Sequence, residues 1–220
     1  MAKGGRRKAL PRPPADNPPK LITLGKGALW RVHPRTYRAA EFNSRGSGDA
    51  RFSPIHRPDG DLIPMLYGAS TRAGALMETV FHDVPTPPRD YILDIETLRD
   101  QHLVVSRVRP KRSTKVVDLS TKGLKRLGLH RTDVIDTSTS IHPLTRQWAE
   151  WLHARATEPA GLLWTSRQDD QARAVVLFGD RLTESAFEVE IDREPLTEGE
   201  HLDALLELAD HIGIGRLFGL

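Results

Sequence analysis

Short apolar segments of strand length outnumber the helical segments of this chain and do not alternate with them along the sequence. Regular alternation of strands and helices is typical of a parallel sheet, whereas an irregular order indicates an α+β fold. The strand-like segments are residues 28–32, 51–53, 65–69, 91–95, 102–108, 115–120, 161–167, 173–179 and 187–191, and the last of them alternates apolar with charged residues. We therefore expect an α+β domain, with residues 161–167 and 173–179 in the middle of a sheet and residues 187–191 at an edge.

Four segments carry apolar residues at helical spacing, and they are residues 70–82, 122–129, 142–154 and 197–212. The first is the best defined, because Ser70 is a good N-cap residue and prolines follow the segment. Its apolar face is predicted to consist of Ala73, Leu76, Met77, Val80 and Phe81, with Glu78 and His82 on the flank. The chain has neither GxGxxG after a strand nor GxxxxGK[ST], so nothing indicates a Rossmann or P-loop nucleotide site.

The basic charge of the chain is concentrated at its N-terminus. Residues 1–20 hold six Lys and Arg against one Asp, a net charge of +5, which leaves about −2 for residues 21–220 of the whole-chain +3. Five prolines in the same segment exclude a helix interior or a central strand. We expect residues 1–20 to be a disordered, Pro-rich arm that either binds polyanions weakly or only raises solubility, and residues 21–220 to form a single domain.

Several classes of protein find no support in the composition. The absence of cysteine removes disulfides, thiolate nucleophiles and Cys-based zinc sites. The nine histidines show no spacing typical of a metal site, and no GxSxG marks a serine nucleophile. No apolar run approaches the roughly 20 residues of a membrane span, and the N-terminal residues lack the apolar core of a secretory signal. We expect a cytoplasmic protein with no bound metal and no membrane contact.

Four residues between positions 30 and 82 have placements that indicate a small site. Arg31 and Arg51 each lie in an apolar, strand-like segment, where an unpaired buried charge is unfavourable. Each therefore meets a carboxylate of the protein or faces a cavity that receives an anion such as a pyrophosphate. Tyr67 ends a strand, where its ring can stack on a nucleobase or nicotinamide or simply pack. Glu78 lies two turns into the helix, either as a surface residue or as a carboxylate that faces a developing positive charge.

A later serine has a similar ambiguity. Ser166 follows Trp164 in the segment 161–167. Its hydroxyl either satisfies a main-chain group or contributes to the same site.

The order of these residues resembles the RES domain family, which is named for its Arg, Glu and Ser. The likeness is carried by LWRVHP (29–34) with Arg31, ARFSP (50–54) with Arg51, MLYGASTRAGALMETVFHD (65–83) with Tyr67 and Glu78, and GLLWTSR (161–167) with Ser166. It covers roughly residues 28–181 and leaves out residues 1–20 and 197–212. The sequence departs from the family pattern at Phe52, where many members have tryptophan, and at Trp164, where many have tyrosine.

The resemblance implies a fold and a partner. RES proteins are toxins of bacterial toxin–antitoxin pairs, with a fold similar to that of ADP-ribosyltransferases, so it implies an α+β core of small mixed sheets with flanking helices and a central cleft. The expected partner is an antitoxin with an Xre-type helix-turn-helix domain, whose C-terminal region blocks the cleft. It implies a hetero-oligomer in which DNA is contacted only through the antitoxin, and residues 197–212 are a candidate contact.

The resemblance also implies a reaction, because known members consume NAD by hydrolysis or phosphorolysis. NAD is then the substrate, and no resident cofactor is expected. The implied catalytic residues are Glu78, Arg31 and Ser166. Glu78 stabilises an oxocarbenium-like ribosyl cation, and Arg31 and Arg51 hold the phosphates, unless Arg51 receives inorganic phosphate as the attacking group. Tyr67 packs on nicotinamide, and Ser166 hydrogen-bonds to the nicotinamide amide or a ribose hydroxyl.

Three functions remain open at this point. The first is degradation of NAD. The second is mono-ADP-ribosylation of a cellular protein, which at least one subgroup of the family is described as performing and which differs only in the acceptor. The third is a non-catalytic module whose basic arm binds nucleic acid and whose cleft is a docking surface. The sequence does not distinguish water, phosphate and protein as acceptors.

Overall fold

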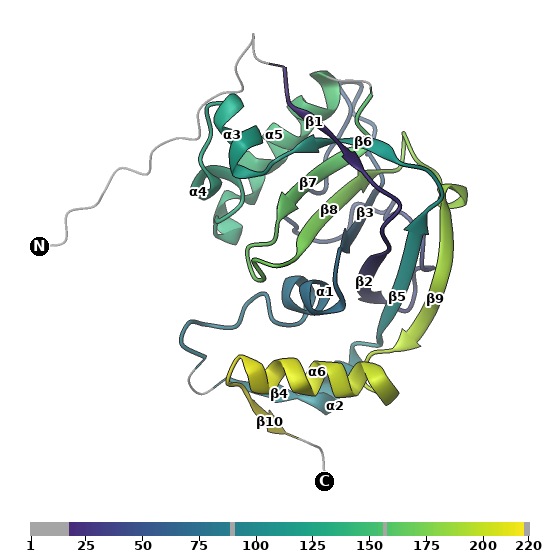
Figure 1. Ribbon diagram of the computed structural model, residues 1–220, viewed down its shortest axis with the longest axis vertical. Helices are drawn as coiled ribbons and strands as arrows, with labels where there is room; N and C mark the ends of the chain where they lie inside the picture. The colour runs from purple at the N-terminus through teal and green to yellow at the C-terminus, as the bar shows by residue number, and fades with distance from the viewer. Residues whose placement is uncertain (1–17, 89–90, 156–157, 218–220) are drawn as a thin grey trace, which may run out of the picture.

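The computed structural model describes residues 18–88, 91–155 and 158–217 (Figure 1). Its centre is one curled, eight-stranded sheet with the strand order β1-β6-β7-β8-β3-β2-β5-β9, in which β6 and β7 are parallel and the other neighbours are antiparallel. The strands are β1 Leu21–Leu24, β2 Leu29–Pro34, β3 Met65–Ala69, β5 Leu103–Pro110, β6 Thr114–Asp118, β7 Gly161–Thr165, β8 Arg173–Phe178 and β9 Phe187–Pro195. A separate parallel pair joins β4 (Ile92–Asp94) and β10 (Gly215–Leu217).

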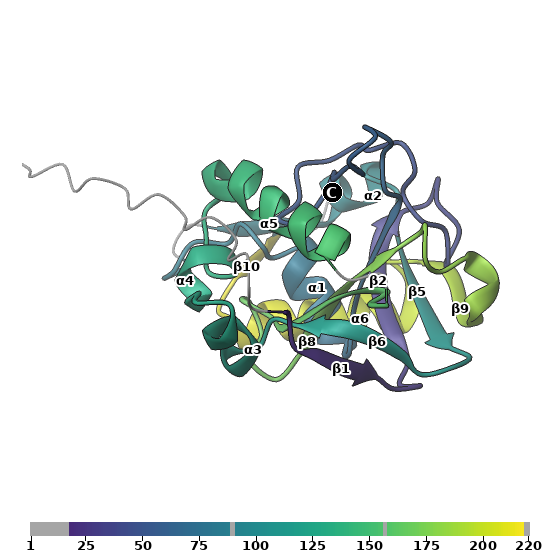
Figure 2. The same cartoon turned by 90° about the horizontal axis from the view of Figure 1, so that it is seen from above.

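The helices form two groups around this sheet. They are α1 Arg72–Thr79, α2 Ile95–Asp100, α3 Thr121–Arg126, α4 Arg131–Val134, α5 His142–Arg155 and α6 Gly199–His211, with 3-10 turns η1 Thr139–Ile141 and η2 Glu184–Ala186. Helices α3, α4 and α5 lie together, and α1 and α6 lie against each other near the other end of the sheet (Figures 1 and 2). The α+β class predicted from the irregular order of segments is confirmed, with one large mixed sheet and a small pair in place of several small sheets.

Both faces of the central strands are buried. Along β8, Ala174, Val176 and Phe178 enter the apolar cluster beneath α3, α4 and α5, whereas Val175 and Leu177 enter a cluster on the opposite face. A strand that is covered on both sides needs apolar residues at every position. This explains the unbroken apolar runs 161–164 and 174–178 in the segments predicted for the middle of the sheet, while β9, which alternates, is confirmed at the edge.

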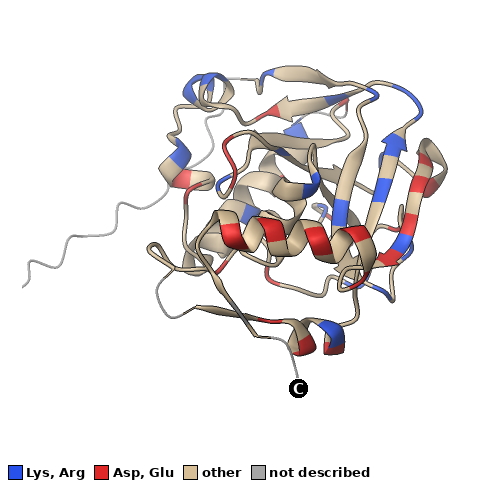
Figure 3. Ribbon diagram, turned by 60° about the horizontal axis from the view of Figure 1, so that its bottom comes forward, with Lys and Arg blue, Asp and Glu red and all other residues tan. Residues whose placement is uncertain are grey.

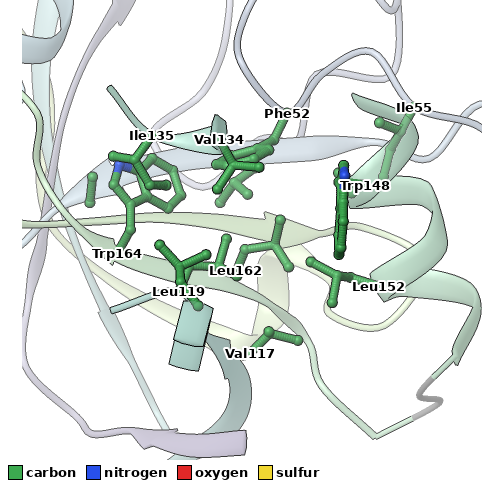
Figure 4. Close-up of a cluster of buried hydrophobic side chains, with 14 of the residues drawn as sticks. Phe52, Ile55, Val117, Leu119, Val134, Ile135, Trp148, Leu152, Leu162 and Trp164 are labelled. Carbon is green, nitrogen blue, oxygen red and sulfur yellow. The ribbon is translucent and has the colours of Figure 1, made fainter. Parts of the chain in front are cut away.

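The cluster beneath α3, α4 and α5 contains both positions at which the sequence departs from the family pattern (Figure 4). The rings of Phe52 and Trp164 meet edge to face, with 5.1 Å between their centroids and 71° between their planes. Buried aromatic pairs favour this geometry, so the two positions pack as one unit in this chain.

The amphipathic C-terminal helix, predicted over residues 197–212, is α6. Its buried residues include Leu205 and Ala209, which pack with α1, α2 and β5. Its acidic residues face solvent (Figure 3). Residues 1–17, most of the predicted arm, lie outside the described residues. The described chain begins just before β1, and Lys20 pairs with Asp118 at 3.3 Å.

Helix α1 begins one residue later than predicted. Its N-cap is Thr71, whose hydroxyl oxygen accepts a main-chain N–H of the first turn at 2.9 Å. Ser70 instead accepts the N–H of Arg173 at 2.9 Å and so ties the start of the helix to β8. Ala73, predicted for the apolar face, is exposed, because the helix buries residues 74–76. A serine or threonine after a strand can cap a helix or hydrogen-bond to the neighbouring strand. Here Ser70 is close enough to β8 to bond to it, so Thr71 caps the helix.

The strand predicted over residues 51–53 was wrong, and the strand predicted over residues 91–95 is present as the shorter β4. Residues 51–53 form a turn closed by the N–H of Ala50 and the carbonyl of Ser53 at 3.1 Å, and the N–H of Phe52 donates to the hydroxyl of Tyr67 instead of to a strand. The strand predicted over residues 91–95 ends at Asp94. Its carboxylate accepts the N–H groups of the next turn at 3.0 and 3.2 Å and so starts α2, as an N-cap does.

A buried histidine joins β2 to the bulge between β5 and β9. His33 is 6% exposed, and its Nε2 lies 2.9 Å from the hydroxyl of the fully buried Ser106. That hydroxyl accepts the N–H of Arg193 at 3.1 Å, so its own proton goes to His33, and Nδ1–H of the imidazole donates to the carbonyl of Pro34 at 3.1 Å. Burial, with Arg31 nearby, lowers the pKa of His33 to about 4. The neutral ring is therefore the folded form.

This histidine makes the folded state sensitive to acid. The unfolded chain takes up a proton near pH 6.5 and the folded chain near pH 4, so stability falls as the pH falls between these values. At pH 5, protonation of His33 in the unfolded chain has lowered the free energy of unfolding by about 2 kcal/mol relative to its value well above pH 6.5. We expect His33→Gln to lose less stability than the unaltered chain between pH 7 and pH 5 in urea unfolding, and exposed His211→Gln to follow the unaltered chain. Identical pH profiles for His33→Gln and the unaltered chain would contradict this.

Candidate active site

A pocket of about 360 Å³ opens between the sheet, α1 and three loops. Four of the five residues singled out in the sequence line it, namely Arg31 of β2, Arg51 of the turn 51–53, Tyr67 of β3 and Glu78 of α1. Strands β2 and β3 are neighbours in the sheet, and α1 follows β3 directly. This order places residues 47 positions apart in sequence around one cavity.

The carboxylate of Glu78 is held by the loop that follows β7. The Ser166 hydroxyl donates to Glu78 Oε1 at 2.6 Å, and the N–H of Arg167 approaches the same oxygen at 3.3 Å. Among the described residues, both of these bonds end on Oε1, so Oε2 is the oxygen that a molecule in the pocket can meet. The prediction that Glu78 shares a site with the arginines therefore agrees with its position.

Ser166 acts on Glu78 from outside the cavity. It is fully buried, and its oxygen also accepts the N–H groups of Gln168 and Asp169 at 3.0 and 3.1 Å. A hydroxyl has a single proton, and here it goes to the carboxylate. Ser166 therefore does both of the things that the sequence left open. Its hydroxyl satisfies main-chain groups, and it also holds Glu78, a residue of the pocket, in position.

We expect Ser166→Ala to destabilise the protein. The change leaves two main-chain N–H groups of the loop without their acceptor and removes a charge-assisted bond to Glu78, which together correspond to about 1–3 kcal/mol. Urea unfolding measures the difference, with exposed Ser44→Ala as the matched control within about 0.5 kcal/mol of the unaltered chain. Equal stabilities for Ser166→Ala and Ser44→Ala would show that the network does not hold the loop.

Two arginines of the pocket meet at one residue. Arg51 Nη1 donates to Thr137 Oγ1 at 2.6 Å, and Arg167 Nη1 donates to the main-chain oxygen of Thr137 at 2.7 Å. Burial lowers the pKa of Arg51, the Glu78 carboxylate raises it, and the Arg167 charge lowers it. These effects show that the three charged groups are close enough to influence one another, and both guanidinium groups line the pocket.

Arg31 lines the pocket, as one of the two expectations required, but its hydrogen bonds go to the protein's own main chain. Its Nε donates to the carbonyl of Tyr67 at 3.0 Å, Nη1 donates to the carbonyl of Ala39, and Nη2 lies 3.4 Å from the carbonyl of Glu41. The side chain is buried, and burial lowers the pKa of its guanidinium to about 10, although the charges of Glu41 and Glu184 raise it. Through these carbonyls Arg31 holds the turn at 38–41 against β2 and β3.

Tyr67 connects these parts of the site. Its hydroxyl oxygen accepts the N–H of Phe52 at 3.3 Å, and its carbonyl accepts Arg31. Burial raises the pKa of the phenol to about 12, so the hydroxyl stays protonated at neutral pH. Tyr67 fixes the turn that carries Arg51, while part of its side chain remains a wall of the pocket.

The polar residues of the pocket that sequence reasoning missed include Arg167, Thr137 and His142. Arg167 directly follows Ser166 in the segment 161–167, so its position next to a candidate site residue could have indicated it. Thr137 lies between two short helices, where no pattern marked it. His142 is buried, and its Nδ1–H donates to the carbonyl of Asp49 at 2.9 Å. Burial lowers its pKa, and the charges of Arg51 and Arg167 add to the effect.

Among the described residues, none of the helices is both long enough and apolar enough to cross a lipid bilayer. The same part of the chain contains no group of three or more His, Cys, Asp or Glu side chains arranged to hold a metal ion.

Comparison with known protein families identifies a match over most of the chain. The family model of the RES domain matches residues 28–198, which span β2 to the end of β9 and include every residue of the pocket. The match reaches further toward the C-terminus than the likeness read from the motifs. A search of curated proteins finds no match.

Proposed function

The chain belongs to the RES domain family, and we propose that it is an enzyme that breaks the bond between nicotinamide and ribose in NAD. The RES domain is linked to NAD-degrading toxins of toxin–antitoxin systems. For this chain, the supporting observation is that Glu78, Arg51 and Arg167 line a single pocket, while its other two acidic residues, Asp49 and Asp83, lie against Arg146 and His82. A dinucleotide with an anionic diphosphate and a cationic nicotinamide riboside suits that arrangement of charges.

The chemistry needs little beyond electrostatics. The pyridinium ring of NAD is already cationic, so it takes the electron pair of the C–N bond and leaves as neutral nicotinamide without a general acid. The paired-carboxylate glycosidases, in contrast, must protonate their leaving group. Positive charge then develops on the ribose carbon, and a fixed carboxylate stabilises it. Water captures this carbon to give ADP-ribose and a proton, and phosphate captures it to give ADP-ribose-1″-phosphate.

The other residues of the site have supporting roles in this proposal. Ser166 positions Glu78, because its proton is used on that carboxylate and not on the nicotinamide amide. Tyr67 forms a wall beside the nicotinamide end, and its hydroxyl holds the turn of Arg51. Arg31 keeps the frame of β2 and β3 in place. No resident cofactor takes part in the proposed reaction, since NAD is the substrate.

A time course of NAD with the purified protein tests the proposal. We expect nicotinamide to accumulate as NAD disappears, with ADP-ribose in the absence of phosphate or its 1″-phosphate in the presence of phosphate. Labelled NAD with cell lysate separates the alternative, because transfer of the label to a protein would identify an ADP-ribosyltransferase. Unchanged NAD in every arm would contradict the proposal and leave a binding module.

The expected partner remains part of the proposal. Family membership supports an antitoxin with an Xre-type helix-turn-helix domain that covers the pocket, with DNA contacted only through it. Co-purification with the product of an adjacent helix-turn-helix reading frame, followed by the same NAD assay, checks this. We expect the complex to consume NAD more slowly than the free chain, and an equal rate would contradict a blocking partner.

A further inference from the structure

The loop that carries Arg167 is anchored on both sides of this residue. Before it, Ser166 bonds to Glu78 at 2.6 Å. After it, Gln168 Nε2 donates to the carbonyl of His82 at 2.7 Å, just beyond the end of α1. An exposed arginine between two fixed neighbours has a restricted main chain, so less freedom is lost when its side chain binds a ligand.

Arg167 and Arg51 approach the pocket from different loops and share one support. Thr137 accepts both, with its hydroxyl for Arg51 and its carbonyl for Arg167, and is 5% exposed. Each guanidinium group has five N–H donors, and the described side-chain bonds of each use Nη1. The remaining donors of both groups are available to oxygen atoms in the pocket.

The two guanidinium groups lie in a mixed field of charges. Burial has the largest effect on the pKa of Arg51 and lowers it, the Glu78 carboxylate raises it, and the Arg167 charge lowers it by less than Glu78 raises it. Arg131, nearby, is paired with Asp136 at 3.0 Å, and Arg146 is paired with Asp49. Arg51 and Arg167 both line the pocket and keep N–H donors beyond those that Thr137 uses, so an anionic ligand gives these donors acceptors.

We infer that Arg51 and Arg167, both of which donate to Thr137, form a subsite for the diphosphate of the dinucleotide. Arg167 then takes the phosphate-binding role that the sequence analysis gave to Arg31. Guanidinium groups bind phosphate oxygens with paired, charge-assisted hydrogen bonds. The inference rests on the proposed function for the identity of the ligand, while the subsite itself rests on the geometry. Arg31 does not fit the part, because its three nitrogens face main-chain carbonyls.

The test compares Arg167→Gln with Arg35→Gln, an exposed arginine outside the pocket lining. The probe is inorganic pyrophosphate, with its Kd measured by calorimetry on the full chain, alongside KM and kcat for NAD. We expect Arg167→Gln to raise the Kd and the KM by about 10- to 100-fold, as for loss of hydrogen bonds to a charged group. Its kcat should change by less than about threefold, because Glu78 keeps its own contacts. Arg35→Gln should leave all three values unchanged.

A second variant keeps the test independent of folding. Thr137→Val has the same shape but lacks the hydroxyl that supports Arg51, whereas the carbonyl that supports Arg167 stays. We expect a smaller rise in both constants for this variant. Pyrophosphate affinity in Arg167→Gln equal to that in Arg35→Gln would overturn the subsite, even if NAD is consumed. Pyrophosphate binding through Arg167 without any NAD turnover would leave the subsite and overturn the proposed function.

Discussion

Replacement of Glu78 by glutamine is expected to slow the release of nicotinamide from NAD by about 10²- to 10³-fold, comparable to the loss of one preorganised electrostatic contact to a transition state. Glutamine has nearly the same shape and keeps an oxygen that can accept the proton of Ser166, so the loop after β7 stays in place. The change removes only the negative charge. Since the charge acts on the developing ribosyl cation, kcat should fall more than KM rises.

The matched control for this variant is Glu207→Gln, on the exposed face of α6. It alters the net charge by the same amount, outside the pocket lining. We expect it to turn over NAD at the rate of the unaltered chain. Comparable rates for Glu78→Gln and Glu207→Gln would remove Glu78 from the mechanism.

Replacement of Arg31 by methionine is expected to destabilise the fold by about 3–5 kcal/mol, since it leaves several buried carbonyl groups without their charged donor. These carbonyls belong to β3 and to the turn at 38–41. Arg31→Lys should recover only part of the loss, because a single ammonium group cannot reach acceptors on three sides in the way that a planar guanidinium group does.

Urea unfolding measures this effect, with exposed Arg35→Met as the control. The same samples report which part Arg31 plays. We expect Arg31→Met to lose activity in proportion to its loss of folded protein. A variant that is as stable as Arg35→Met but binds NAD weakly would return Arg31 to the phosphate-binding part first assigned to it.

The apolar pattern predicted the central part of the fold well. Residues 174–178 are apolar because the sheet is covered on both faces, and that requirement is local enough to read from the sequence. The pattern failed at the ends of elements. Asp94 is both the last residue of β4 and the N-cap of α2, and the choice between Ser70 and Thr71 as N-cap of α1 depends on β8. Such choices depend on contacts between segments that are distant in sequence.

The sequence predicted which residues line the site better than it predicted what each residue contacts there. Arg31, Arg51, Tyr67 and Glu78 do line one pocket. An arginine within an apolar strand must have partners, but nothing in the sequence says that the carbonyls of a turn eight residues away would supply them. The shared support of the two pocket arginines was not predictable either, because Thr137 lies in a connection without a pattern and meets them only in the fold.

The bound position of NAD in the Glu78→Gln variant tests the central claim most directly, because that variant should bind the dinucleotide and cleave it slowly. A crystal structure of this complex is expected to show the nicotinamide ribose within hydrogen-bond distance of residue 78. The diphosphate should contact the guanidinium groups of Arg51 and Arg167. NAD bound outside this pocket, or with its nicotinamide ribose turned away from residue 78, would contradict the account.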